Sequence, residues 1–320
     1  MTLLDEFPAD GFIGSYLRYA RRLTDAPDVY HVGCALAALS AAFAPRVAFE
    51  GAGGKPGLLN LWIGLVGPSR KTTAIDLLRP VLVDGPIAWT DVDRKSTERT
   101  FARFADQPRG IVLADDWAAV CKRIAQPAWE GGCSLLCSLF DGETMRRVTC
   151  GPKGEEAQVV ETRVDRPRLT SLTGFRGGHK LPPSLESLTR RMLWLYGEPK
   201  RYRAASPFDD SRGADRLFAH LALLRRQSFD LRVQIARPVW KVWSRFSRTN
   251  CPMIPLHPLY SRLPGLLLRA AALDVLGRVG LVADPRLPVC VQADDVDRMI
   301  RVLGPAAVRG LQIAFGEAGE

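Results

Sequence analysis

Four short hydrophobic segments set the pattern of this 320-residue chain: residues 61–66, 110–114, 168–174 and 191–196. Segments of this length, with little alternation between apolar and polar positions, are typical of strands covered on both faces of a parallel sheet. Helical periodicity fills much of the sequence between them, as in residues 74–79 and 134–140. The pattern therefore predicts an α/β fold built on a parallel sheet.

Outside this central region, helical patterns dominate. Residues 11–44 predict a pair of helices, and residues 46–50 a short strand. After a polar, basic stretch at 200–212, amphipathic helices are predicted at 217–224, 264–279 and 294–303, and Gly304-Pro305 predicts a break before a last short helix. We expect three parts: a helical N-terminal segment (1–45), an α/β core (46–199) and a mostly helical C-terminal domain (200–320).

The first predicted core strand runs directly into Gly67-Pro68-Ser69-Arg70-Lys71-Thr72-Thr73, and a helix follows. A strand, a glycine turn, a Lys-Thr pair and a helix together form a phosphate-binding loop: backbone N–H groups and the helix N-terminus face the phosphates, while the lysine neutralises their charge. The hydroxyl of Thr72 is then expected to hold Mg²⁺. The pattern predicts a nucleoside triphosphate as the ligand and residues 67–73 as its binding loop.

This loop departs from the usual pattern in two ways. Three residues separate Gly67 from Lys71 where five are usual, and Arg70 takes the place of a second glycine. Each hydrogen bond to a charged group contributes roughly 1.5–3 kcal/mol, so losing two N–H donors weakens nucleotide binding unless Arg70 contacts a phosphate itself. A second glycine-rich stretch, residues 51–55, is followed by Pro56-Gly57 and a strand, which predicts a hairpin turn.

The second predicted core strand ends at Asp115-Asp116, where an NTPase needs acidic residues. We expect Asp115 to hold Mg²⁺ and Asp116 to orient the attacking water; the alternative for this pair is an N-cap of the next helix. Thr170 or Thr173, on the third strand, is a candidate sensor of the γ-phosphate. Arg191, which precedes the fourth strand, is expected to stabilise γ-phosphate charge across a subunit interface, or to be an exposed basic residue.

Charge is distributed unevenly along the chain, whose net charge is +10. Residues 1–160 hold 18 basic and 19 acidic residues, and residues 161–320 hold 26 basic and 15 acidic ones. The halves therefore carry −1 and +11. An excess of this kind favours a polyanionic partner, with DNA expected before RNA; the alternative is an arginine-rich solvated surface. We expect nucleic-acid binding in the C-terminal half.

The remaining features of the sequence bear on the cellular compartment. No run of apolar residues is long enough to span a membrane, and the N-terminus carries acidic residues instead of a basic signal start. The seven cysteines form no Cys-x-x-Cys pair, and the four histidines have no zinc spacing. Reduced thiols and the absence of a signal segment predict a cytoplasmic protein.

The order of the motifs resembles a known family. Phosphate-loop residues 65–74 are followed by Val112-Leu113-Ala114-Asp115-Asp116, by residues 139–142 and by Leu188-Thr189-Arg190-Arg191-Met192-Leu193. Residues 263–271 and 294–296 complete the series. Together they resemble the YfjI-like family, primase-helicase-like P-loop ATPases of prophages and plasmids. The shortened loop and Asp116, where the family pattern has Glu, depart from it.

This resemblance implies a RecA/AAA-type three-layer core, ATP and Mg²⁺ as cofactors, and an ATP-dependent motor that acts on DNA during replication of a mobile element. It also implies a homo-oligomer such as a ring. Because the sequence shows no attached primase domain, we expect either a separate primase or action without one. The competing expectation is a degenerate P-loop protein that hydrolyses little ATP and serves as a nucleic-acid-binding adaptor subunit.

Overall fold

The computed structural model describes residues 3–50, 56–84, 87–88, 97–126, 129, 131–150, 159–177, 181–198, 210–228, 231–239, 241–242, 244–245, 260–284 and 286–316. The helices are η1 (Leu3–Glu6), α1 (Phe12–Leu23), α2 (Asp28–Phe43), α3 (Lys71–Leu78), η3 (Arg79–Val81), α5 (Thr97–Asp106), α6 (Trp117–Ile124), α7 (Gly132–Asp141), η5 (Pro183–Leu185), α8 (Glu186–Thr189), α9 (Ser211–Gln227), α11 (Leu263–Val279) and α12 (Ala293–Phe315). The strands are β1 (Ala48–Glu50), β2 (Pro56–Gly57), β3 (Trp62–Val66), β4 (Ile87–Ala88), β5 (Arg109–Ala114), β6 (Met145–Cys150), β7 (Val159–Val164), β8 (Arg168–Phe175), β9 (Met192–Tyr196), β10 (Arg232–Ile235) and β11 (Val289–Val291).

A five-stranded, wholly parallel sheet forms the centre, in the order β4-β5-β8-β3-β9. The predicted α/β class with a parallel sheet is confirmed. From β3 the chain crosses to the far edge strand β4, returns through β5 and β8 to lie beside β3, and then crosses to β9. Ligands of open α/β sheets bind outside the carboxyl ends of the strands, where the strand order reverses. Here that place is the end of β3 and β8.

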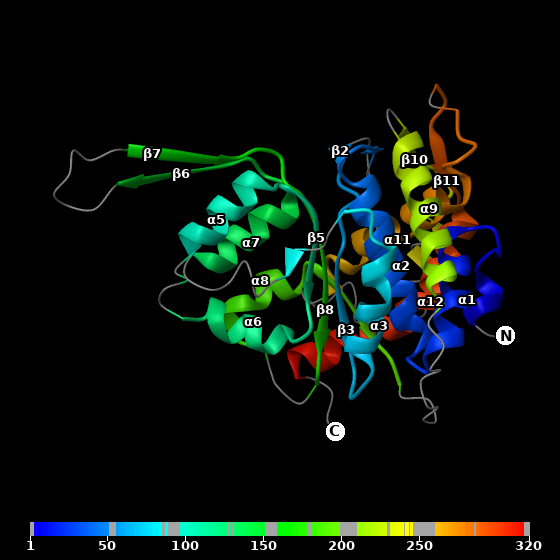
Figure 1. Cartoon of the computed structure of the whole chain (residues 1–320), viewed down its shortest axis with the longest axis horizontal. Helices are drawn as coiled ribbons and strands as arrows, with labels where there is room; N and C mark the ends of the chain where they lie inside the picture. Colours follow the sequence, from blue (N-terminus) through cyan, green and yellow to red (C-terminus); the bar gives the residue numbers. More distant parts are fainter. Residues whose placement is uncertain are drawn as a thin grey trace.

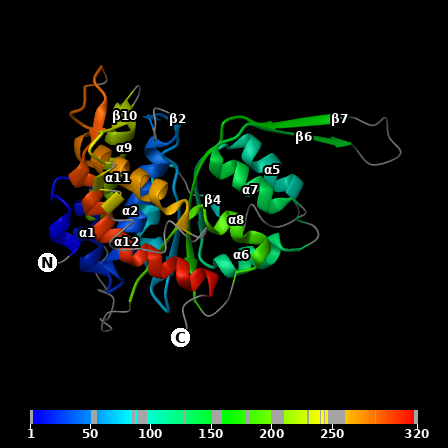
Figure 2. The same cartoon turned by 180° about the vertical axis from the view of Figure 1, so that it is seen from behind.

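Helices cover both faces of this sheet (Figure 1). On one face lies α2, where a Cβ on Gly33 would meet Leu195, Leu65 and Ile63 at 2.9–3.4 Å. On the other lies α12, where a Cβ on Gly310 would come within 2.6 Å of the carbonyl oxygen of Trp194. The view from behind brings α12 to the front (Figure 2). Glycine and alanine on these helices permit the close approach.

Helix α2 is buried along nearly its whole length and contacts α1, α3, α9 and α11 as well as the sheet. Its small residues allow these neighbours to pack tightly around it. The tyrosine at its start also reaches the end of β3: the Tyr30 hydroxyl donates to the carbonyl of Val66 at 2.6 Å. The helix thus supports the edge of the sheet from which the phosphate loop emerges.

Two smaller sheets complete the described structure. A four-stranded sheet, β11-β10-β1-β2, joins strands from both ends of the chain, with β1 and β2 antiparallel as the predicted hairpin requires; its turn, residues 51–55, lies outside the described residues. The antiparallel pair β6–β7 extends away from the central sheet (Figures 1 and 2). The residues that connect these two strands, 151–158, also lie outside the described part.

The predicted break at Gly304-Pro305 is wrong, because α12 continues through it to Phe315. Proline removes one helical hydrogen bond and costs roughly 3 kcal/mol in a helix interior. Pro305 is exposed, so water can satisfy the carbonyl that loses its partner, while Leu303, Ala307 and Leu311 on the other face are buried against the sheet. Packing along the helix outweighs the local cost.

The three predicted parts of the chain remain a prediction, since the boundary at 199–200 lies outside the described residues. Among the helices that the structure describes, none combines the length and the apolar character needed to cross a bilayer.

Candidate phosphate-binding site

The turn after β3 requires glycine at its first position. Gly67 has a φ of 151°, and a Cβ there would lie 2.2 Å from the Tyr30 hydroxyl and 2.7 Å from the carbonyl oxygen of Gly197. The Gly67 N–H donates to the carbonyl of Phe175 at 3.2 Å, which attaches the start of the loop to the end of β8. The loop therefore leaves the sheet in one fixed direction, at the edge where the strand order reverses.

Arg70 occupies the position directly before α3 in a left-handed conformation, with φ 66° and ψ 6°. This is a conformation for which glycine is suited, so a non-glycine residue here carries backbone strain. The Arg70 guanidinium pairs with Asp25, with Nε 3.0 Å from Oδ1. A phosphate contact by Arg70 would require this ion pair to open.

Lys71 is the first residue of α3, and its side chain is buried. The ammonium group donates a hydrogen bond to the carbonyl of Gly67, which closes the loop on itself. Burial lowers the pKa of Lys71, the positive charge of Arg176 lowers it further, and Asp116 opposes the shift. A buried ammonium group near a second cation is stabilised by an anion, because the anion supplies the opposite charge that the site lacks.

The carboxyl end of β8 brings the loop and the acidic strand together. A Cβ on Gly174 would lie 2.6 Å from the carbonyl oxygen of Asp115 and 3.4 Å from Cβ of Lys71. Gly174 therefore fills the space between the phosphate loop, which follows β3, and Asp115, which follows β5. The predicted site residues Lys71 and Asp115 are neighbours for this reason.

The two aspartates differ in their surroundings. Asp115 is exposed, and its Oδ1 lies 3.9 Å from the Arg79 guanidinium. Asp116 is the N-cap of α6, where Oδ1 accepts hydrogen bonds from the N–H groups of Ala118 at 2.9 Å and Ala119 at 3.3 Å. The N-cap alternative thus describes Asp116 in this structure, and both hydrogen bonds of the cap go to the same carboxylate oxygen, Oδ1.

The hydroxyl groups of the site fall into two sets. Thr72, in the first turn of α3, is exposed, while Thr73 is partly buried. On β8, Thr173 is buried and its hydroxyl has no hydrogen-bond partner among the described residues, next to Gly174. Thr170 lies further from this end of the strand and its hydroxyl is 2.6 Å from that of Ser40. Of the two candidate sensors, Thr173 is nearer to the carboxyl end of β8, directly before Gly174.

Arg191 lies at the opposite edge of the sheet, before the first residue of β9. Its guanidinium pairs with Asp141 at 2.6 Å and donates to the carbonyl of Ser187 at 2.8 Å. Asp141 also accepts from Arg262 at 3.0 Å. The structure therefore does not bring Arg191 together with Lys71 and Asp115 within one chain, which leaves a role across a subunit interface as its only route to the site.

Arg176, which the motif reasoning missed, is part of this edge. It follows β8 directly, is exposed, and lies close enough to Lys71 to lower the pKa of that lysine. No hydrogen bond or ion pair of Arg176 is found among the described residues. The signal was present in the sequence: a lone arginine placed immediately after a core strand, at the end where ligands bind.

The residues present are compatible with ATP and Mg²⁺. The first N–H groups of α3 have no partner within the helix, and Lys71 and Arg176 supply positive charge for the phosphates. Thr72 and Asp115 supply a hydroxyl and a carboxylate, both exposed. No group of three or more metal-binding side chains exists among the described residues, and Mg²⁺ held by one or two protein ligands, water and phosphate oxygens needs none.

A scan against protein-family models finds no match to this chain, and a search of the curated proteins finds none either. The interpretation of this site therefore depends on its own geometry.

Proposed function

We propose that this chain is an ATPase with a RecA/AAA-type P-loop core, which uses ATP binding and hydrolysis to act on DNA. The observation that supports it best is the meeting of three segments around Gly174: the phosphate loop after β3, Asp115 after β5 and Arg176 after β8. These segments are up to 109 positions apart in sequence, between Gly67 and Arg176. One strand, β8, separates the loop strand from the acidic strand, as expected of a core of this class.

The roles follow from the chemistry of the side chains. Residues 67–73 would hold the phosphates, with Lys71 neutralising their charge, and Thr72 with Asp115 would hold Mg²⁺. Bound Mg²⁺ neutralises charge that develops on the phosphate oxygens. Asp116 would orient water with the oxygen that is not used in the helix cap. Arg176 would stabilise the γ-phosphate from within the chain, and Arg191 from a neighbouring subunit of a homo-oligomer.

The cellular setting belongs to the same proposal. The motif order resembles the YfjI-like family, which implies replication of a mobile genetic element and work with a separate primase. The excess of basic residues after position 160 supports DNA as the partner.

A degenerate loop that binds nucleotide without hydrolysing it is the second candidate. It is favoured because both cations of the loop already have a partner within the protein: Lys71 donates to the carbonyl of Gly67, and Arg70 pairs with Asp25. In that case the chain would act as a nucleic-acid-binding adaptor subunit.

One experiment separates the candidates. Binding of a fluorescent ATP analogue and release of phosphate would be measured with and without single-stranded DNA, in the wild-type chain, in Lys71→Ala and in Lys122→Ala, an exposed lysine on α6 as the matched control. We expect Lys71→Ala to lose analogue binding and Lys122→Ala to keep it. Turnover stimulated by DNA supports the motor, and binding without turnover supports the adaptor. Unchanged analogue binding in Lys71→Ala would refute both.

A further inference from the structure

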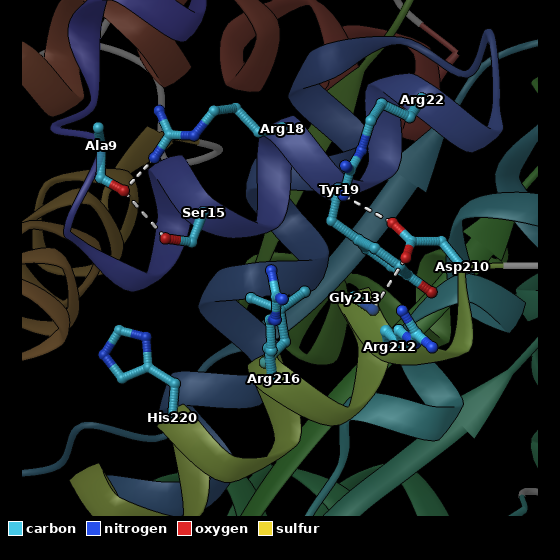
Figure 3. A pocket seen from close by; sticks show the side chains of 11 residues that line it. Ala9, Ser15, Arg18, Tyr19, Arg22, Asp210, Arg212, Gly213, Arg216 and His220 are labelled. Carbon is cyan, nitrogen blue, oxygen red and sulfur yellow. Dashed lines mark hydrogen bonds and ion pairs between the residues drawn. The ribbon is translucent and has the colours of Figure 1, made fainter.

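A second cationic feature lies between α1 and α9. It is a pocket of about 660 Å³, lined by residues of both helices and by Ala9 from the segment before α1. Figure 3 shows the side chains of both helices around it, with Arg18 reaching the carbonyl of Ala9 and Arg22 reaching Asp210. None of its lining residues belongs to the phosphate loop, β5 or β8. We call it the arginine pocket.

Four arginines line the pocket in two matched pairs. Arg18 and Arg22 are four residues apart on α1, and Arg212 and Arg216 are four residues apart on α9. Residues with this spacing lie one turn apart on the same face of a helix, about 6 Å along its axis. Two short ladders of positive charge therefore face the same space.

The acidic counterpart is too small to balance them. Asp210 is the single carboxylate among the lining residues, so the lining carries a net charge of +3 with His220 neutral. Burial lowers the pKa of His220, whose ring packs edge-on against Phe12, so burial disfavours the charged form of this ring. Like charges this close repel one another, and an anion in the pocket relieves that repulsion.

Two of the four guanidinium groups bond to other groups of the protein, and the other two have no partner among the described residues. Arg18 donates to the carbonyl of Ala9, and Arg22 pairs with Asp210 at 2.6 Å. Arg212 and Arg216 are exposed and have no hydrogen-bond or ion-pair partner among the described residues. In Figure 3, Arg216 extends from α9 into the space between the helices.

Several polar groups of the pocket already have partners. The Ser15 hydroxyl donates to the carbonyl of Ala9 at 3.0 Å, and the Asp210 carboxylate accepts from the Gly213 N–H at 2.9 Å as well as from Arg22. What the pocket mainly offers a ligand is therefore positive charge in a repeated spacing. Such a surface suits successive phosphates of a strand, whose backbone is the same whatever its sequence.

We propose that the arginine pocket binds the phosphate backbone of single-stranded nucleic acid, independently of sequence. The inference builds on the proposed function and names where its DNA partner would lie. It also moves part of the nucleic-acid site out of the basic C-terminal half, because Arg18 and Arg22 come from the N-terminal segment.

The test uses the full chain and a fluorescent oligothymidylate. Affinity would be measured by anisotropy over a series of salt concentrations in the wild type and in Arg212→Ala/Arg216→Ala. We expect the double variant to bind roughly tenfold more weakly at low salt. The plot of log affinity against log salt should become shallower by about 1.4, since each phosphate neutralised on a single strand contributes about 0.7. Binding of the ATP analogue should not change.

The matched control is Arg226→Ala/Arg286→Ala, which removes the same charge at two exposed sites outside the pocket. An equal loss in both double variants, or no loss in the pocket variant, would overturn the proposal. Inorganic tripolyphosphate that displaces the oligonucleotide at equal phosphate concentration would identify a small polyphosphate as the occupant, and that too would overturn it. If the pocket variant bound the oligonucleotide like the wild type while analogue binding still required Lys71, the pocket proposal would be wrong and the proposed ATPase would be unaffected. If analogue binding did not require Lys71 but the pocket variant lost oligonucleotide affinity, the proposed ATPase would be wrong and the pocket proposal would be supported.

Discussion

The phosphate loop and the arginine pocket are the two places proposed to bind anions, and they differ in how many of their cations already have a partner. In the loop, Lys71 is buried and bonded to Gly67, and Arg70 is paired with Asp25. In the pocket, Arg212 and Arg216 are exposed and have no partner among the described residues. A small anion bound in the loop would meet groups already fixed in position, while a strand in the pocket would meet side chains free to adjust.

This difference has an energetic consequence. Donors that are already fixed and partly desolvated lose little conformational entropy when a ligand binds, and they distinguish ligands by shape. Exposed arginines contribute a modest electrostatic binding free energy, which salt weakens by screening. The loop should therefore be sensitive to substitutions of a few atoms, and the pocket should tolerate them with small, salt-dependent losses. Four predictions examine this contrast at the loop and at the opposite edge of the sheet.

The largest effect is expected at Arg176. If its charge faces the γ-phosphate, Arg176→Ala should lower ATP turnover about a hundredfold, as the loss of a group that stabilises developing charge does, while analogue binding changes little. Phosphate release and analogue binding would be measured together, with Arg176→Lys expected to recover part of the turnover.

Arg103→Ala, at an exposed position on α5, serves as the control for Arg176. A parallel fall in binding and turnover, or a lowered melting temperature in Arg176→Ala, would mean that Arg176 supports the structure instead of the reaction.

Much of this contrast was visible in the sequence for the loop and none of it for the pocket. Residues 61–73 carry strand, turn, lysine and helix in one continuous stretch, so a local pattern was enough to locate Lys71. The pocket joins α1 to α9, whose arginines at 22 and 212 are 190 positions apart. Counting charges shows that the C-terminal half is basic, but it cannot show that α9 from this half packs beside α1 from the neutral half.

The central fold was predictable for a similar reason. Buried strands such as β3 and β9 have a composition that identifies them without knowledge of their neighbours. The continuity of α12 was not predictable, because Pro305 is tolerated only through the packing of Leu303, Ala307 and Leu311 on the sheet. The ion pair that engages Arg191 was hidden too, since Asp141 is 50 residues away in the chain.

The second prediction concerns the spacing between the loop and the acidic strand. Gly174→Ala places a Cβ 2.6 Å from the backbone oxygen of Asp115, and backbone must move to accommodate it. We expect a loss of roughly 1–3 kcal/mol of unfolding free energy together with weaker analogue binding. Urea denaturation and analogue titration would measure both.

Gly265→Ala is the matched control, because a Cβ at that position on α11 meets nothing within 4 Å. Alanine in a helix should be neutral or stabilise by up to about 1 kcal/mol there. If the two variants had equal stability and nucleotide affinity, the close approach at Gly174 would have no energetic importance.

Arg70 provides the third test, since its conformation and its ion pair can be separated. Arg70→Ala and Arg70→Gly both remove the pair with Asp25, but only glycine relieves the left-handed backbone at φ 66°. The glycine variant should therefore be more stable than the alanine variant by about 1 kcal/mol. Denaturant unfolding compares them directly, and an alanine variant at least as stable as the glycine variant would contradict the assignment of strain to this residue.

The smallest effect is expected at the amino-end edge of the sheet, where Asp141 pairs with Arg191. Burial alone would raise the pKa of Asp141, but the hydrogen bond and charge of Arg191, aided by Arg262, outweigh it and hold that pKa below its usual range. A carboxylate with a lowered pKa contributes stability above its unfolded pKa of about 4, and this contribution is lost as the pH falls through the folded value.

The unfolding free energy of Asp141→Asn should therefore lie below that of the wild type at pH 7, and the two should converge as the pH falls below 4. Urea denaturation at several pH values measures the gap, and a gap that stayed constant from pH 7 to pH 3 would contradict an ionic origin. Analogue binding by Asp141→Asn should match the wild type at neutral pH, because this pair is at the edge of the sheet opposite to the phosphate loop.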